Sequence, residues 1–358
     1  MEALIETILA ELRPLLRDWY PDADEQAGPE VLEVDPRAVA HVIRVRVPRI
    51  AAPPATLIVK AVTTDPAPDA VARPRLMPLT EPSERLRLEF EALRSIDARL
   101  ADLGDPRFAA VRPLGILPLS SALVMEAFAG QPLHRLLVRG SFGRAAELRP
   151  SSLARAAGRW LRILHDTPTS TQPIRQGTRQ ELVDAFTAFG AYLAEARGSR
   201  DLGPVIEAGI GAVGQLSDRL PTVISHGDFA PRNILVDGSG RLAVIDLLAR
   251  WQAPPYEDLA GFLVALHTSR ANAATRGLLF GRAVERLEPA FLTGYYGSEP
   301  VPRNAIRVYE LLLVLDKWSA RASRSGRRGG FRRLGEQMID SHFDARSRHL
   351  AHRLREGT

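Results

Sequence analysis

Three polar side chains whose types suit phosphate chemistry lie within one short stretch of the sequence. Asp228 begins a loop, Asn233 ends it five residues later, and Asp246 follows thirteen residues further on, after a second hydrophobic run. Phosphoryl transfer uses such a set. One carboxylate orients an attacking hydroxyl and accepts its proton, while an amide and a second carboxylate hold Mg²⁺ on the phosphates.

A hairpin around these residues would bring them together. The runs NILV (233–236) and LAVID (242–246) flank the turn-forming pairs Asp237-Gly238 and Ser239-Gly240. A turn here returns the chain, so Asp246 would lie beside Asn233. His226 and Gly227 precede Asp228, and we expect His226 to be a hydrogen-bonded histidine that shapes the loop rather than a proton carrier.

Lysine is rare in this chain. Lys60 and Lys317 are the two lysines among 47 basic residues, and a compact ammonium is chemically distinct from the guanidinium used elsewhere. Lys60 ends the strand-like run LIVK, where a plain strand-edge charge is the alternative to a functional lysine. An acid on the following helix should pair with it. Glu89 shares a helix face with hydrophobic residues, and the competing acids are Glu84 and Glu91.

The elements that would position these residues fall into two groups. An amphipathic helix pattern opens the chain, with acidic residues that argue against a signal peptide. A periodic helix over 83–104, which Gly104 would end, interrupts a set of short strand-like runs. These runs are 31–34, 42–47, 56–62, 112–119 and 121–128. We therefore predict a small antiparallel sheet with one helix.

From Gln131 onward the hydrophobic pattern is helical. The expected helices cover roughly 152–166, 179–197, 203–219, 256–269, 272–294, 302–323 and 331–354. The sequence thus predicts an α+β fold with a first lobe over 1–128, a helical second lobe over 129–358, and a cleft between them that contains the acceptor site.

Five segments together resemble the aminoglycoside phosphotransferase family, which is similar to choline kinase and other small-molecule kinases. They are HGDFAPRNILV, VIDL, LIVK, LVMEAFAGQPL and WLRILH, and the resemblance spans roughly residues 30–265. It implies a protein-kinase-like two-lobed fold. It also implies transfer of the γ-phosphate of ATP (or GTP), with Mg²⁺, to a hydroxyl of a sugar, amino alcohol or antibiotic-like small molecule.

The resemblance also implies roles for individual residues. Asp228 would be the catalytic base, and Asn233 and Asp246 the Mg²⁺ ligands. Asp258 in YEDLAGFL would steady the catalytic loop, with His226 in support; an ordinary acid at a helix N-terminus is the alternative for Asp258. The nucleotide-binding residues would be Lys60 and Glu89 on the phosphates, and Met125, Glu126, Ala127 and Phe128 as a hinge that meets adenine through backbone groups.

The sequence departs from the family pattern at two places that bear on whether the protein is an active enzyme. Residues 35–41 contain no glycine, so no glycine-rich phosphate cover is visible, although Arg37 or His41 could reach a phosphate. Asp246 is followed by Leu247 and Leu248 instead of Phe-Gly. The rival hypothesis is therefore a kinase-fold protein that binds a nucleotide or metabolite without turnover. The three polar residues retained at the site argue against it.

The sequence says less about the acceptor. Residues 301–358 carry an excess of basic side chains, which favours a neutral or anionic acceptor over a polyamine if these helices line its site. Trp251 either stacks on a sugar ring or belongs to the core. The sequence argues against a protein kinase, because the segment 246–258 is too short for an activation loop.

Two further sequence features, a basic run and a histidine pair, are interpreted as ordinary surface structure. The basic run 321–333 is interpreted as a solvated loop, since no nucleic-acid-binding motif accompanies it and no such partner is expected. His349 and His352 lack a third metal ligand and indicate a surface helix.

The composition of the chain excludes disorder as its main state, because 45% of its 358 residues are hydrophobic and 25% are charged. The absence of cysteine excludes disulfides, and the absence of a long apolar run predicts no membrane span and a cytoplasmic location.

Overall fold

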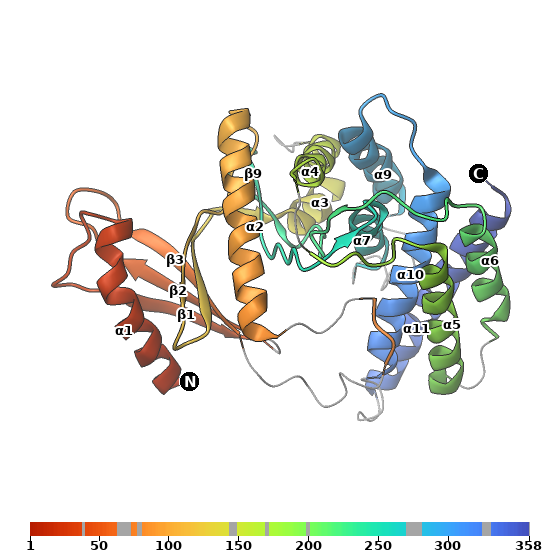
Figure 1. The fold of residues 1–358 in the computed structure, drawn as a ribbon, viewed down its shortest axis with the longest axis horizontal. Coiled ribbons are helices and arrows are strands. Elements are labelled where there is room, and N and C mark those ends of the chain that lie inside the picture. Colours follow the sequence, from red (N-terminus) through yellow and green to blue (C-terminus); the bar gives the residue numbers. More distant parts are fainter. Residues whose placement is uncertain are drawn as a thin grey trace.

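The structure, a computed structural model, describes residues 1–37, 40–62, 73–76, 81–142, 149–168, 172–197, 201–269, 281–323 and 331–357. Helix α1 (Glu2–Trp19) is followed by a five-stranded antiparallel sheet in the order β1-β2-β3-β5-β4 (Figure 1). The strands are β1 (Glu30–Pro36), β2 (Ala40–Val47), β3 (Ala55–Val62), β4 (Pro113–Leu117) and β5 (Ala122–Glu126). Helix α2 (Pro82–Leu103) connects β3 to β4. This confirms the predicted sheet with one helix.

The two faces of the sheet have different neighbours. Side chains alternate along a strand, so Leu57 and Val59 of β3 lie on one face, where they share a core with Ile8 and Leu12 of α1. Lys60 belongs to the opposite face, which Figure 1 shows covered by α2. Strand alternation therefore turns Lys60 toward α2 and the rest of the molecule.

Helix α2 has the termini that its sequence predicts. A proline lies in its first turn, and Gly104 ends it in the left-handed conformation at φ 58°. Its buried side is apolar except at Glu89, which is 2% exposed. A buried carboxylate among leucines needs a partner of opposite charge.

The rest of the chain is mainly helical. Its helices are α3 (Leu133–Phe142), α4 (Pro150–His165), α5 (Arg179–Arg197), α6 (Gly203–Val213), α7 (Tyr256–His267), α9 (Gly281–Tyr296), α10 (Arg303–Ala322) and α11 (Phe331–Arg355). Short strands lie among them: β6 (Gln131–Pro132), β8 (Ile234–Val236) and β9 (Leu242–Val244) form one sheet, and β7 (Val223–Ile224) pairs with β10 (Gln252–Ala253). The predicted α+β class is confirmed.

Some boundaries differ from the predicted ones. Helix α6 ends at Val213 instead of residue 219, since Gly211 and Gly214 weaken helix formation there. Helix α3 was not predicted. The predicted helix over 272–294 corresponds to α9, and its first part, residues 272–280, lies outside the described residues. Most of the basic run 321–333 also lies outside them, at 324–330.

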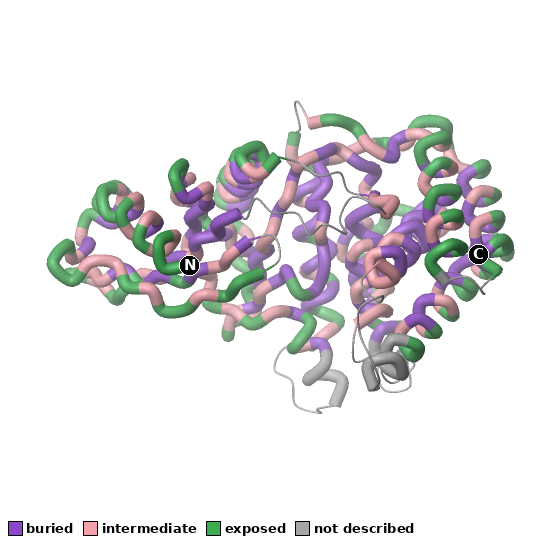
Figure 2. The backbone as a smooth tube through the Cα atoms, turned by 90° about the horizontal axis from the view of Figure 1, so that it is seen from below, coloured by how far each residue is buried: buried purple, intermediate pink, exposed green. Residues whose placement is uncertain are grey.

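In the described part of the chain, three hydrophobic clusters make up the core, and Figure 2 shows this core as buried backbone. One lies between α1 and the sheet, and one among α5, α6, α10 and α11. The third contains Leu93 of α2, Leu123 of β5 and Phe229 of the predicted catalytic loop. The sheet-bearing part is thus packed onto the helical part around the site, and a lobe boundary at residue 128 stays a prediction. In the described portion, no helix is both long and apolar enough to cross a membrane.

Candidate active site

The predicted hairpin is present and places two of the three polar residues side by side. Strands β8 and β9 pair in antiparallel register, with Ile234 opposite Val244. Just beyond this pair, the Ile245 N–H donates to the Asn233 carbonyl at 2.9 Å. Asp246 follows with φ 58°, a left-handed conformation that aspartate tolerates better than most residues. Such local strain is commonly retained where a side chain must be aimed at a functional site.

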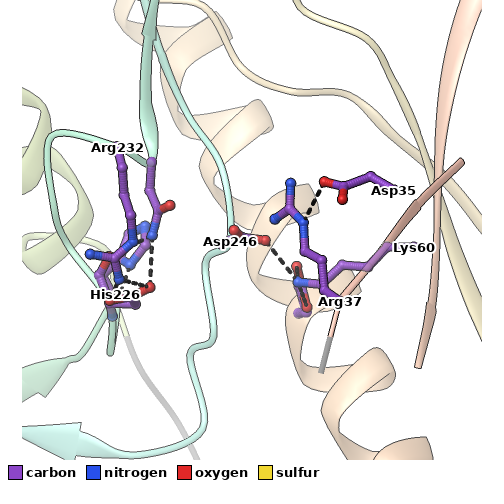
Figure 3. Close-up of polar contacts among 9 residues, drawn as sticks. Asp35, Arg37, Lys60, His226, Arg232 and Asp246 are labelled. Atoms are coloured by element: carbon purple, nitrogen blue, oxygen red, sulfur yellow. Dashed lines mark hydrogen bonds and ion pairs between the residues drawn. The ribbon is translucent and has the colours of Figure 1, made fainter. Parts of the chain in front are cut away.

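Lys60 lies between two carboxylates that come from distant parts of the chain. Its Nζ donates to Glu89 Oε1 at 2.7 Å and Oε2 at 3.0 Å, and to Asp246 Oδ1 at 2.9 Å (Figure 3). The other two candidate acids are elsewhere: Glu91 pairs with Arg87, and Glu84 lies in the first turn of α2. The structure thus joins β3, α2 and the hairpin through one ammonium.

The charges of this trio reinforce one another. Burial alone would lower the pKa of Lys60, but the Glu89 and Asp246 carboxylates outweigh it and raise that pKa above its usual value. Burial would likewise raise the pKa of Asp246, but Lys60, together with the nearby Arg37, lowers it. All of these pKa directions keep the lysine cationic and Asp246 anionic.

The loop between β7 and β8 holds the third polar residue. Asn233 Nδ2 donates to Asp228 Oδ2 and to the Asp228 carbonyl, both at 2.9 Å. Arg232 forms an ion pair with the same carboxylate, with Nη2 donating to Oδ2 at 2.6 Å (Figure 3). Because the Asn233 nitrogen is used in this way, the Asn233 Oδ1 is the amide atom that suits a cation.

A buried carboxylate fixes the start of this loop. Asp258 on α7 accepts hydrogen bonds from the backbone N–H groups of His226 at 2.6 Å and Gly227 at 3.0 Å. His165 Nε2 lies 3.1 Å from the same carboxylate. Burial would raise the pKa of Asp258, but His165 and the His226 N–H lower it overall. Gly227 adopts φ 79°, so its lack of a side chain permits this turn.

His226 is fully buried, and burial lowers its pKa. Its Nδ1 accepts the Asp228 N–H at 3.3 Å, and its ring lies edge-on to Phe229 and Trp160. A neutral ring held in this way supports the interpretation of His226 as a residue that shapes the loop.

The importance of Asp258 is open to a stability measurement. Asp258→Asn would remove a buried charge that accepts two backbone N–H groups, and would leave His165 without its anionic partner. We expect a loss of about 3–5 kcal/mol in the free energy of unfolding, as for other broken buried pairs. Denaturant unfolding measures this loss. An unchanged midpoint would show that the loop does not depend on this carboxylate.

The neighbouring Glu257 provides a matched control with its own pH dependence. It is 5% exposed, and burial, with the Asp258 charge, raises its pKa from 4.5 to about 7. The folded state therefore keeps this proton where the unfolded chain has lost it. Stability should fall as pH rises from about 4.5 to 7, by up to about 3 kcal/mol from this group.

Glu257→Gln should abolish that contribution and cost only roughly 1 kcal/mol at pH 7, because the amide oxygen still accepts hydrogen bonds from Ser225 and Trp251. Unfolding curves of both proteins at several pH values give the comparison. Parallel pH profiles for wild type and variant would contradict the assignment.

The hinge region is only partly free to bind a base. The Ala127 N–H donates to the Thr56 carbonyl at 2.9 Å, so this group is already used within the sheet. The Glu126 carboxylate accepts the Tyr20 hydroxyl at 2.8 Å and thereby ties α1 to the hinge. Met125 is buried against α2. A cavity of about 490 Å³ is lined by Glu126, Ala127 and Phe128, among others.

The remaining candidates are placed as follows. Arg37 lies beside Asp246 and Lys60 (Figure 3) and donates to Asp35 at 2.9 Å, whereas His41 pairs with Ala61 inside the sheet. Trp251 is 1% exposed and belongs to the core, so it does not face a sugar. His352 pairs with Glu356 on the exposed side of α11.

Sequence reasoning missed several groups at the site. Arg232, His165 and Glu257 contact the predicted catalytic loop or the acid that holds it, and Lys317 lines a cavity beside Asp228. The scarcity of lysine was the one signal that pointed to Lys317. Nothing in the sequence singled out the other three. Arg232 contacts Asp228 within the loop itself, whereas the contacts of His165 and Glu257 depend on how α4 and α7 pack around the loop.

Comparison with known proteins shows the family and the fold of the chain. The model of the phosphotransferase enzyme family matches residues 59–292. A choline/ethanolamine kinase family protein from Mesorhizobium loti superposes with a TM-score of 0.52 at 16% identity, covering 90% of this chain and 87% of that one. No curated protein sequence matches the chain significantly.

Two further solved structures share the fold. Spectinomycin phosphotransferase, solved with ADP and spectinomycin, has a TM-score of 0.52 at 12% identity, with 97% and 98% of the two chains covered. Choline kinase from Cryptosporidium parvum has a TM-score of 0.53 at 10% identity, with 98% and 96% covered. The fold is that of the kinase-like phosphotransferases, and the family match supports a small-molecule kinase. The chain belongs to the phosphotransferase enzyme family.

Proposed function

We propose that this kinase transfers the γ-phosphate of ATP (or GTP), bound with Mg²⁺, to a hydroxyl group of a small molecule. The observation that carries the proposal is the convergence of two groups of residues. Asp228 and Asn233 are hydrogen-bonded on one side, and Lys60, Glu89 and Asp246 form one ionic cluster on the other. The hairpin joins the two groups.

The residues present fit a magnesium ion. The Asn233 amide oxygen and the Asp246 carboxylate are hard oxygen ligands, the type that Mg²⁺ prefers. Across the described residues no group of three or more His, Cys, Asp or Glu is arranged to hold a metal. Two protein ligands match an ion whose other positions are filled by phosphate oxygens and water. When bound, the ion would neutralise phosphate charge.

The protein groups then have separate tasks. Lys60, oriented by Glu89, would bind phosphate oxygens. The Asp228 carboxylate would orient the acceptor hydroxyl and take its proton, for which the Arg232 ion pair must first open. The Phe128 N–H has no acceptor among the described residues and would donate to the base, in place of the Ala127 N–H, which is already used.

An acceptor screen tests the proposal. The protein is incubated with ATP or GTP and Mg²⁺ in the presence of sugars, amino alcohols, hydroxy acids and antibiotics, and mass spectrometry detects phosphorylated products. The proposal requires an acceptor-dependent product that disappears when the metal is chelated. Nucleotide binding without any phosphorylated product would favour the rival hypothesis of a binding protein without turnover.

A further inference from the structure

A small cavity adjoins Asp228, and no residue of the Lys60 cluster lines it. Its volume is about 160 Å³, and it lies between the catalytic loop, α7 and α10. Asp228 and Gly227 come from the loop, Gly261 from α7, and Lys317 with Leu313 from α10. Sites for drug-sized ligands usually measure about 300–1,000 Å³. This cavity is therefore sized for a small substituent next to the reacting hydroxyl.

Two carboxylates in the wall of the cavity are paired with arginine. Asp228 pairs with Arg232. Asp316 Oδ1 lies 2.9 Å from Arg73 Nη1, which also donates to Ser319 at 3.1 Å. Arg73 belongs to the described segment 73–76, which lies between β3 and α2 in the sequence and contacts α10 through this pair. Neither carboxylate is left with an uncompensated negative charge.

The other two carboxylates are compensated as well. Asp258 accepts the backbone N–H groups at the start of the catalytic loop and lies against His165. Glu257 accepts hydrogen bonds from Ser225 and Trp251, both at 3.0 Å. The acids around the cavity are thus all engaged with arginines or hydrogen-bond donors of the protein and do not form a site for a cation.

Lys317 is the exception in this wall. It is partly buried, and among the described residues its ammonium has no hydrogen bond and no ion pair. Burial and the nearby Arg232 lower the pKa of Lys317 to about 8, against the opposing effect of Asp228 and Asp316. The side chain is mostly protonated at neutral pH. A partly desolvated ammonium without a partner is unfavourable, and an anion from a ligand would remove that cost.

We propose that the acceptor carries an anionic group, a carboxylate or a phosphate, close to the hydroxyl that is phosphorylated, and that Lys317 binds this group. The inference rests on the proposed function and specifies its substrate class. The hydroxyl oxygen bonds to the γ-phosphorus while the bond to the β,γ-bridging oxygen breaks. The hydroxyl proton goes to Asp228, and the nucleoside diphosphate leaves. A cationic acceptor would meet Lys317 and Arg232 as like charges.

Binding at Lys317 can be observed directly, because the chain has two lysines. In protein labelled with ¹³C at lysine Cε, two side-chain signals are expected, and Lys317→Arg removes one and so assigns both. Four small molecules that contain the same vicinal diol serve as probes. Glycerate and glycerol 3-phosphate are anions, glycerol is neutral, and 3-aminopropane-1,2-diol is a cation. We expect either or both of the two anions to shift the Lys317 signal and raise its titration midpoint, and the other two to leave it unchanged. No response to either anion, or a response to the amine, would overturn the proposal.

Enzyme kinetics provide a second test beside the binding experiment, with an anionic acceptor that the screen has identified. Lys317→Met should lower kcat/KM by roughly 30-fold or more, as expected when one partner of a desolvated charge pair is removed. Lys317→Arg should retain most of the activity, and so should Arg99→Met, which removes one charge at an exposed position of α2.

The two arms separate this inference from the proposed function. Phosphorylation of cationic acceptors alone would overturn the anionic substrate class and leave the kinase activity standing. A Lys317 signal that responds to anions in a protein without any phosphoryl transfer would support the anion site and overturn the proposed function. Equal effects of Lys317→Met and Arg99→Met would refute the role of Lys317.

Discussion

Asp228→Asn is expected to lower turnover by roughly 10²-fold or more and to leave Mg-ATP affinity within a few-fold, the pattern typical of lost general-base catalysis. The amide keeps the shape of the side chain and can still meet Asn233, but it has neither the charge nor the basicity needed to accept a proton. Asp228 contacts the loop residues Arg232 and Asn233 and not the Lys60 cluster. Nucleotide binding should therefore change little.

Steady-state kinetics on the acceptor found in the screen, with isothermal titration of Mg-ATP, measure both quantities. Asp18→Asn provides a control, because it makes the same chemical change at an exposed position of α1. The control should retain wild-type turnover. If Asp228→Asn also turns over at a near-normal rate, the base lies elsewhere.

Asp246→Asn is expected to weaken Mg-ATP binding by at least about 10- to 100-fold, the range seen when support for a bound metal is lost. Binding of ATP without Mg²⁺ should weaken much less, because the lost carboxylate repels free phosphates and ligates only the metal. Titrations with ATP in the presence of Mg²⁺ or of a chelator measure the two affinities. Equal Mg-ATP affinity in variant and wild type would contradict the assignment.

Asp246 also pairs with Lys60, so a second variant must separate the two roles. Glu89→Gln disturbs the same lysine, since Glu89 lies 2.7 Å from Lys60 Nζ, but Glu89 is not a proposed metal ligand. We expect Glu89→Gln to weaken ATP binding with and without Mg²⁺ to a similar extent. If Mg²⁺ no longer strengthened ATP binding in either variant, the lysine, and not the metal, would account for the result with Asp246→Asn.

Local sequence patterns predicted the fold class and the residues that the structure brings together. The distance between Asn233 and Asp246 along the chain is bridged by one hairpin, whose turn residues are visible in the sequence. The position of Lys60 follows from strand alternation, and that of Glu89 from its place on the apolar face of α2. Each of these inferences depends on one element and its period.

The other parts of the site depend on packing between elements that are distant in the sequence. Lys317 meets the loop around Asp228 only because α10 packs against α7, and His165 meets Asp258 through the placement of α4. The role of Trp251 could not be predicted for the same reason. A tryptophan shortly after the candidate metal ligand Asp246 could either stack on a sugar ring or lie in the core. Its burial, which decides between them, is a property of the folded chain.

The most direct test of the account follows the γ-phosphoryl group itself. ATP labelled with ¹⁸O in the non-bridging γ-oxygens is incubated with Mg²⁺, the acceptor and either the wild-type protein or Asp228→Asn, and mass spectrometry locates the label. The account predicts that the wild-type protein yields an acceptor phosphate with three ¹⁸O atoms and unlabelled ADP, and that the variant yields roughly 10²-fold less. Label found only in inorganic phosphate, or equal transfer by both proteins, would contradict it.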